Sequence, residues 1–117
     1  MSRLVGIRIL PEAKITGYLL NNEHSNGGPK ARFFSAFGFN RDAPAAFVTA
    51  LLAHADEHDV VSERSVANGV TRVIRGPMNT PDARNPVVDV VWFQFTGESA
   101  QRLVTAYPAR QKNAPAG

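Results

Sequence analysis

The sequence predicts an α+β fold in which about three N-terminal helices precede a four-stranded antiparallel β-sheet meander. Up to residue 58 the apolar residues recur at helical spacing, and from residue 60 they alternate as in strands. Asn68-Gly69 is a strong hairpin signal between two strand-like segments. The 117 residues, 44% hydrophobic and 20% charged, suit one globular core. Helices followed by antiparallel strands are typical of the α+β class.

Three helices are expected before the sheet, each with a proline in its first turn. The predicted ranges are 11–21, 29–38 and 43–58. Residues 3–10 form an extended lead-in, and the segment between the first two helices is rich in Asn and Gly, which favour turns. Asp42 is the expected N-cap of the third helix.

Four strands are expected after the helices. The predicted ranges are 60–66, 70–75, 87–95 and 102–107. The stretch 76–86 holds three Pro and one Gly and is expected to be a loop. We therefore expect a single globular domain over residues 1–108 and a flexible tail over 109–117.

The composition excludes several functional classes. The chain has no cysteine, which excludes a disulfide scaffold, a thiolate zinc site and a cysteine nucleophile. It has no apolar run of about 20 residues and no secretory signal, so we expect a cytoplasmic protein without a membrane partner. The net charge of +3 permits an anionic partner without requiring one. Ten arginines against three lysines suit phosphate contacts, although genomic base composition explains such a ratio equally well.

We expect no metal and no cofactor. His54 and His58 have the i, i+4 spacing of metal ligands, but the metalloprotease motif needs Glu directly after the first histidine, where this chain has Ala55. The helical wheel places His54 outside the apolar stripe, which predicts a solvated helix end. The chain also lacks the glycine-rich motifs of nucleotide-binding loops.

The first candidate site combines His24 and Lys30. On the helical wheel Lys30 points toward the apolar stripe of its helix, in the first turn, where a cation opposes the helix dipole. A bound anion at the helix N-terminus would compensate, and a Lys30 side chain that extends to solvent is the alternative. His24 lies six residues upstream in a Gly-containing turn and is suited to proton transfer, or is a surface histidine.

The second set of candidates lies on the predicted sheet. Alternation places Leu103, Thr105 and Tyr107 on one face of the last strand, where the two hydroxyl groups can donate to a phosphate. The candidate substrate-binding residues are Arg72, Arg75, Arg102 and Trp92. Trp92 could stack on a base, although a core position is the more common role of such a residue.

The ordered combination of these motifs resembles a family of uncharacterised bacterial domains of similar length. The motifs are Lys14-Ile-Thr-Gly-Tyr-Leu-Leu-Asn21, His24, Gly27, Lys30-Ala31, Phe33-Phe34, Gly38-Phe39, Gly76-Pro77, Trp92 and Arg102-Leu-Val-Thr-Ala-Tyr-Pro108. The same combination is similar to C-terminal toxin domains of bacterial polymorphic toxin systems. Those domains are grouped with the barnase, EndoU, colicin and RelE ribonucleases.

The resemblance implies metal-independent RNA cleavage by transfer to the 2′-hydroxyl. It implies that His24 is the general base or acid, that Lys30 stabilises the phosphate, and that Thr105 and Tyr107 make further phosphate or proton contacts. It also implies RNA and a cognate immunity or antitoxin protein as partners. The alternative is a non-catalytic module that binds a protein or a nucleic acid, in which His24 caps the next helix and Tyr107 anchors the sheet. We expect the four residues to converge in one open cleft if the domain is catalytic.

Overall fold

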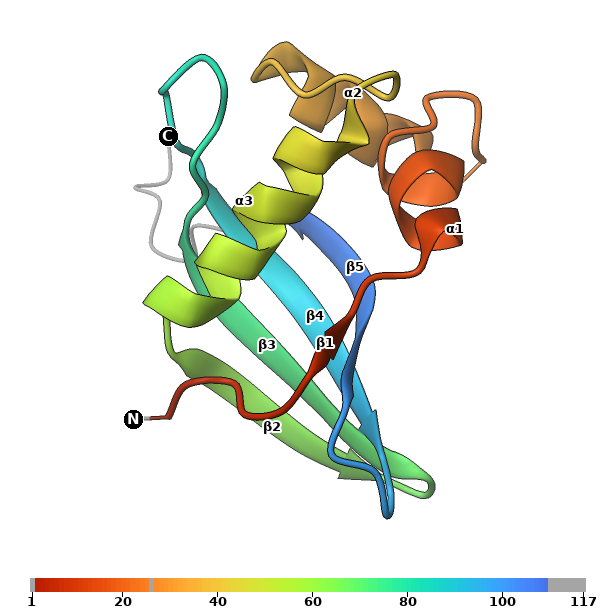
Figure 1. Ribbon diagram of the computed structural model, residues 1–117, viewed down its shortest axis with the longest axis vertical. Coiled ribbons are helices and arrows are strands. Elements are labelled where there is room, and N and C mark those ends of the chain that lie inside the picture. The colour runs from red at the N-terminus through yellow and green to blue at the C-terminus, as the bar shows by residue number, and fades with distance from the viewer. Residues whose placement is uncertain (1, 26, 110–117) are drawn as a thin grey trace, which may run out of the picture.

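A mixed sheet, covered by helices on one face, is the centre of the computed structural model (Figure 1), which describes residues 2–25 and 27–109. In these residues the sheet has five strands in the order β1-β5-β4-β3-β2. The strands are β1 (Arg8–Ile9), β2 (Val60–Val66), β3 (Gly69–Pro77), β4 (Val87–Phe95) and β5 (Gln101–Pro108). The helices are α1 (Glu12–Lys14), the π-helix η1 (Ile15–Leu19), α2 (Gly28–Ala36) and α3 (Pro44–Glu57).

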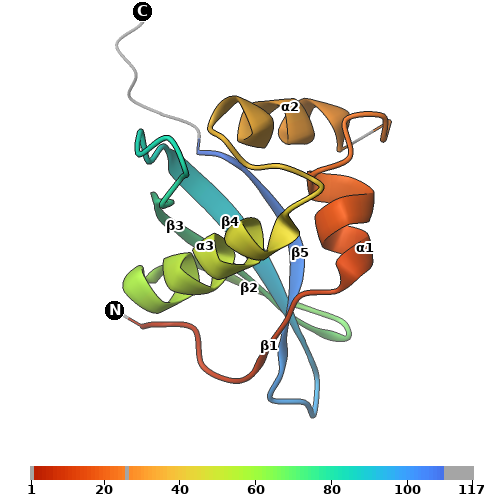
Figure 2. The same cartoon turned by 45° about the horizontal axis from the view of Figure 1, so that its top comes forward.

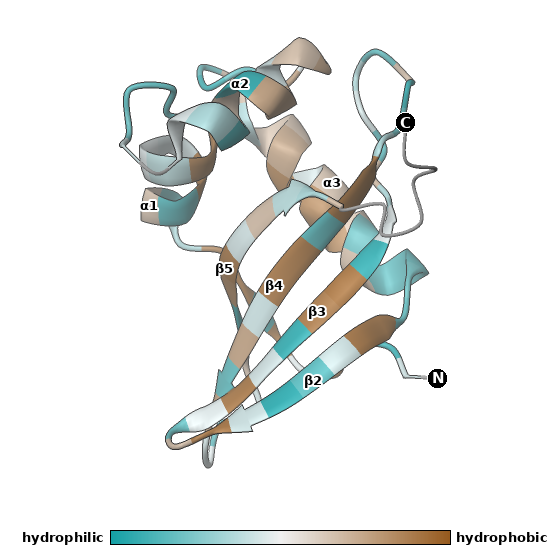
Figure 3. Cartoon of the chain, turned by 180° about the vertical axis from the view of Figure 1, so that it is seen from behind, coloured by the Kyte–Doolittle hydropathy of each residue, from teal (hydrophilic) through white to brown (hydrophobic). Residues whose placement is uncertain are grey.

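The helices leave one face of the sheet uncovered. α3 crosses in front of the sheet, whereas α1, η1 and α2 lie beyond the upper half of β5 (Figures 1 and 2). We call the face that carries α3 the inner face and the opposite face the outer face. Seen from behind, the outer face of β2 to β5 is crossed by none of the described helices (Figure 3).

The predicted antiparallel meander is confirmed for β2 to β5, but the sheet has a further strand, which is parallel. In β1, Arg8 pairs with Gln101 of β5, in the segment predicted as an extended lead-in. The backbone N–H of Gln101 donates to the carbonyl oxygen of Ile7 at 2.7 Å. The side-chain Nε2 of Gln101 donates to the carbonyl oxygen of Val5 at 3.1 Å. The prediction missed β1 because its partner lies at the other end of the chain and a two-residue strand has no period.

The three predicted helical regions are confirmed, with local differences. In the first, one α-helical turn continues as η1, whose wider turn buries Ile15 and Leu19. Asp42 does not cap α3, which starts after Ala43 without a side-chain cap. Instead the Asp42 N–H donates to the side-chain oxygen of Asn40 at 2.8 Å.

The hydrophobic core fills the space between α3, α2 and the inner face of the sheet. Phe34 of α2 and Phe47 of α3 are buried, with ring centroids 4.8 Å apart. Trp92 of β4 is 0% exposed. The prediction that Trp92 contacts a substrate is therefore wrong, because its indole is enclosed by the core.

His54 also belongs to the core, which corrects the expectation of a solvated helix end. It lies on the α3 face that carries Phe47 and Leu51, and it is 1% exposed. Its Nε2 lies 3.1 Å from the Gly76 carbonyl oxygen and 2.9 Å from that of Val88. Because carbonyl oxygens only accept, Nε2 carries the proton, and the buried Nδ1 has no hydrogen-bond partner among the described residues. Burial lowers the pKa of His54 more than the two carbonyl contacts raise it.

Acidification below pH ~6.5, the ordinary histidine pKa, is expected to destabilise the fold through His54. Its folded pKa is lowered, so in this window the unfolded state binds more protons and the free energy of unfolding falls as pH falls. The expected slope approaches about 1.4 kcal/mol per pH unit. Urea denaturation at a series of pH values from 7.5 to 5 measures this slope. His54→Gln should remove this component, and the matched variant His58→Gln should only reduce it, because the charge of His58 contributes to the lowered pKa of His54. Equal pH slopes in wild type and His54→Gln would contradict the assignment.

Two further expectations concern the ends of the chain and membranes. The tail predicted at 109–117 lies, from residue 110 on, outside the described residues. Among the helices that the structure describes, none has the length and apolar character needed to cross a membrane.

Candidate active site

Tyr18 is the centre of a cluster of polar side chains beside the C-terminal half of β5. Its ring centroid lies 5.1 Å from that of His24, in an edge-to-face contact. Its hydroxyl oxygen lies 3.1 Å from Thr105 Oγ1. The ammonium nitrogens of Lys14 and Lys30 each lie 5.5 Å from the centroid of the phenol ring. The structure thus brings together His24, Lys30 and Thr105, three of the four predicted catalytic residues.

The local backbone explains why Tyr18 and His24 meet. Ile15 and Leu19 are buried on one side of η1, which leaves Tyr18 half-buried and directed at Thr105 of β5. The turn that carries His24 then closes onto Tyr18 through Gly27. A Cβ atom on Gly27 would overlap the carbonyl oxygen of Tyr18 and lie 2.7 Å from Cδ1 of its ring. Glycine at this position therefore permits the close approach.

The His24 ring is held in one tautomer by the same turn. The Gly27 N–H donates to Nδ1 of His24 at 2.9 Å, and the Gly28 N–H donates to the His24 carbonyl oxygen at 2.8 Å. Because Nδ1 accepts a hydrogen bond, the neutral imidazole carries its proton on Nε2. This arrangement favours His24 as a hydrogen-bond donor over His24 as a general base.

The surroundings of Tyr18 favour its ionised form. Burial raises the pKa of the phenol, but this effect is outweighed by the Thr105 hydroxyl, by the hydrogen-bonding ammonium of Lys30, and by the charges of Lys30 and Lys14. The pKa of Tyr18 is therefore lowered from its ordinary value. A cavity of about 540 Å³ opens beside the cluster, and its lining includes Lys14, Tyr18 and His24. This volume is in the range of small-molecule sites.

A β-bulge determines which side chains of β5 accompany Thr105. The register with β4 shifts between Leu103 and Thr105, so that Val104 is the extra residue. Leu103 therefore faces the core and is 2% exposed. Thr105 and Tyr107 lie on the outer face, opposite Val91 and Asp89. The prediction that Leu103 shares their face is wrong, because alternation does not reveal a bulge.

The predicted substrate-binding arginines do not join the Tyr18 cluster. Arg75 forms a bidentate ion pair with the buried Asp89, at 2.7 and 2.9 Å, next to Tyr107 on the outer face. Arg102 lies at the other end of that face, with its guanidinium carbon 5.5 Å from the ring centroid of Phe95.

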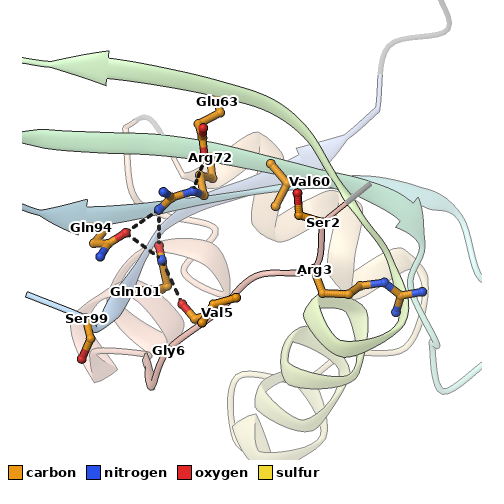
Figure 4. A pocket seen from close by; sticks show the side chains of 10 residues that line it. All are labelled: Ser2, Arg3, Val5, Gly6, Val60, Glu63, Arg72, Gln94, Ser99 and Gln101. Atoms are coloured by element: carbon orange, nitrogen blue, oxygen red, sulfur yellow. Dashed lines mark hydrogen bonds and ion pairs between the residues drawn. The ribbon is translucent and has the colours of Figure 1, made fainter.

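Arg72 lines a separate cavity of about 240 Å³ at the foot of the inner face (Figure 4). Its Nε donates to Glu63 and its Nη1 to Gln94, both at 2.6 Å. Gln94 in turn accepts from Gln101 at 3.2 Å, and Gln101 donates to the Val5 carbonyl. These polar groups are satisfied by one another, so we assign Arg72 to the attachment of the N-terminal segment to the sheet.

A comparison with protein families identifies the domain. A family model described as "Domain of unknown function (DUF6883)" matches residues 5–110. The chain belongs to the DUF6883 family. Searches of curated proteins and of solved structures find no significant match. The family assignment covers the Tyr18 cluster and both faces of the sheet, and it carries no activity with it.

Sequence reasoning on this DUF6883 domain missed Tyr18 as a functional candidate. The residue stands inside the motif Lys14–Asn21, but in an amphipathic helix a tyrosine is typical of a position that packs on the core. A stronger signal was available in the spacing. Tyr18 lies four residues after Lys14, on the same side of a helix, and six residues before His24.

Within the described residues, no group of three or more His, Cys, Asp or Glu could hold a metal ion.

Proposed function

We propose that this domain cleaves RNA without a metal ion, by transfer of the phosphodiester to the ribose 2′-hydroxyl. The observation that carries the proposal is the convergence of His24, Lys30 and Thr105 on Tyr18 beside an open cavity. A phenol with a lowered pKa and two adjacent ammonium groups provide a proton acceptor and positive charge for a phosphate. The resemblance to toxin-type ribonucleases supports the same chemistry.

The reaction has two proton transfers. The 2′-oxygen attacks phosphorus and the bond from phosphorus to O5′ breaks, which gives a 2′,3′-cyclic phosphate and a 5′-hydroxyl. The Tyr18 phenolate accepts the 2′-hydroxyl proton, and the Lys30 ammonium donates a proton to O5′. Because Lys30 adjoins the phenol, Tyr18 then returns its proton to the Lys30 amine, directly or through water, and the site is restored.

The other members of the cluster bind and position. His24, with its proton on Nε2, donates to a non-bridging phosphate oxygen. Lys14 contributes charge that compensates the additional negative charge of the transition state. Thr105 is a positioning residue, because its hydroxyl orients Tyr18 and lowers its pKa.

The direct test is incubation of the purified domain with total RNA in the presence of a chelator. Wild type is expected to produce fragments with 2′,3′-cyclic phosphate ends. His24→Ala and Lys30→Ala should each reduce the rate by about 10²–10⁴-fold. His58→Gln is the matched histidine control, because His58 contacts the Pro77 carbonyl and not the cluster.

Melting temperatures of all variants show whether the fold is kept. Absence of cleavage by wild type, or cleavage by His24→Ala at the wild-type rate, would overturn the proposal.

One observation favours the non-catalytic alternative. His24 accepts the N–H of Gly27, the N-cap residue of α2, so the imidazole also secures the start of that helix. In a binding module this would be its whole role. Wild type would then bind RNA or a protein without cleaving RNA, and His24→Ala would lower stability alone.

A further inference from the structure

The outer face of the sheet combines aromatic and basic side chains and carries none of the described helices (Figure 3). Strand register assigns its residues, because side chains paired across strands point to one face. Trp92 and Leu103 pair with each other and are buried on the inner face. The next pair along the two strands, Phe93 with Arg102, therefore lies on the outer face. Phe95 follows Phe93 by two residues and shares that face.

Phe93 and Phe95 form an aromatic pair on this face. Their ring centroids are 4.9 Å apart and the rings are nearly perpendicular, at 83°. Phe93 lies over Gly69, where a Cβ atom would come within 2.6 Å of its Cζ. Phe95 is 39% exposed, and the Arg102 guanidinium lies over its ring. Large aromatic side chains exposed on an uncovered sheet face are typical of a binding surface.

The charge of the outer face suits an anionic partner. Arg64, Arg75 and Arg102 project from its strands. Among the described residues of β2 to β5, the acidic side chain on this face is that of Asp89. Asp89 is 3% exposed and fully engaged by Arg75, so its charge is not presented to a ligand. Glu98, in the turn before β5, reaches Arg102 at 3.4 Å, in a pair between partly exposed side chains.

The outer face is continuous with the candidate active site. Thr105 hydrogen bonds to Tyr18 at the edge of β5 and also belongs to the outer face. Arg102 lies three residues before Thr105 on the same strand, which corresponds to about 10 Å along the sheet. A polymer whose scissile phosphate lies at Tyr18 can therefore reach the aromatic pair within a few nucleotides.

We propose that the outer face binds the RNA strand beside the scissile phosphate, with bases stacked on Phe93 and Phe95 and a phosphate held by Arg102. This inference rests on the proposed function and names its substrate as single-stranded RNA. Stacking on a sheet requires bases that are free of a duplex, and aromatic rings interleaved with arginines bind such bases irrespective of sequence. Double-stranded RNA does not present its base faces to a flat surface.

Binding of a non-cleavable strand tests the inference independently of catalysis. The probe is a fluorescent 12-nucleotide RNA with 2′-O-methyl groups, followed by anisotropy. Phe95→Ala is expected to weaken binding by about five- to 150-fold, as for the loss of one stacked base. Arg102→Gln should weaken binding and make it less dependent on salt. Ile7→Ala, at an exposed apolar position outside the sheet face, is the matched control.

Each of three results would overturn the inference. Phe95→Ala could bind the strand as tightly as wild type does, or a 12-base-pair duplex could bind as tightly as the single strand. The third result is a dimer, seen by size-exclusion chromatography, that Phe95→Ala dissociates.

Cleavage of a dinucleotide separates the inference from the proposed function, because a dinucleotide is too short to reach Phe95. If only the inference fails, Phe95→Ala cleaves dinucleotide and long RNA with wild-type constants. If only the proposed function fails, the strand binds at this face and no RNA is cleaved. If both hold, Phe95→Ala raises KM for long RNA alone.

Discussion

Replacement of Tyr18 by Phe is expected to reduce RNA cleavage by about 10²–10⁴-fold without unfolding the domain. The substitution keeps the ring that contacts His24 and the two lysines, and it removes only the hydroxyl that would accept the 2′-hydroxyl proton. Single-turnover cleavage of a defined RNA measures the loss, and circular dichroism checks the fold. A Tyr18→Phe rate within about twofold of wild type would exclude the phenol as the proton acceptor.

The pH profile distinguishes a chemical role of Tyr18 from a packing role. In the proposed mechanism the phenolate accepts the proton, so the wild-type rate should increase with pH up to the pKa of Tyr18, which lies below its ordinary value. Thr105→Val removes the hydroxyl that contributes to this shift, so the increase should move to higher pH. Thr71→Val is the matched control, because Thr71 lies on β3 and pairs with Phe93 of β4 instead of with β5. An unchanged profile in Thr105→Val would show that Thr105 does not act through the phenol.

Replacement of Trp92 by Ala is expected to lower the free energy of unfolding by about 3–5 kcal/mol. The indole is 0% exposed, and its removal leaves a cavity between α3 and the sheet. Such a loss is a large fraction of the stability of a typical domain, about 5–15 kcal/mol. Urea denaturation gives the difference directly.

Trp92→Phe is the informative companion variant. It keeps most of the ring volume and removes the buried Nε1–H, which has no hydrogen-bond partner within residues 2–25 and 27–109. Its cost should therefore be much smaller than that of Trp92→Ala, because an unpaired buried donor carries a penalty of about 1–3 kcal/mol. Equal destabilisation by both variants would mean that the phenyl ring of Trp92→Phe does not fill the space left by the indole.

Local pattern explains which parts of the fold could be predicted. The three helical regions and the strands from residue 60 onward follow from apolar periodicity and from proline positions. The hairpin is confirmed between β2 and β3, but Gly69 pairs with Val66 inside the sheet instead of forming the turn. Gly69 instead leaves space for the ring of Phe93 on the neighbouring strand. The residues next to Gly69 in the sequence do not predict this cross-strand contact.

Non-local contacts explain what the sequence could not provide. The helical wheel placed His54 outside the apolar stripe, and the carbonyl partners that make its burial acceptable come from β3 and β4. In the site, the motif selected His24, Lys30 and Thr105, whereas Tyr18 was missed because its function depends on a threonine 87 residues away. A pattern read along the chain does not contain such pairings.

The position of β5 between β1 and β4 also determines when the Tyr18 cluster can assemble during synthesis. A ribosome releases the N-terminal segments first, at about 5–20 residues per second. β1 and Tyr18 emerge early, but their partners Gln101 and Thr105 lie in the last strand. Contacts this distant in sequence also form slowly. A nascent chain that stops before residue 105 therefore holds His24 and both lysines without an assembled site. The proposed RNA cleavage should begin only after the strand that completes the sheet has left the ribosome.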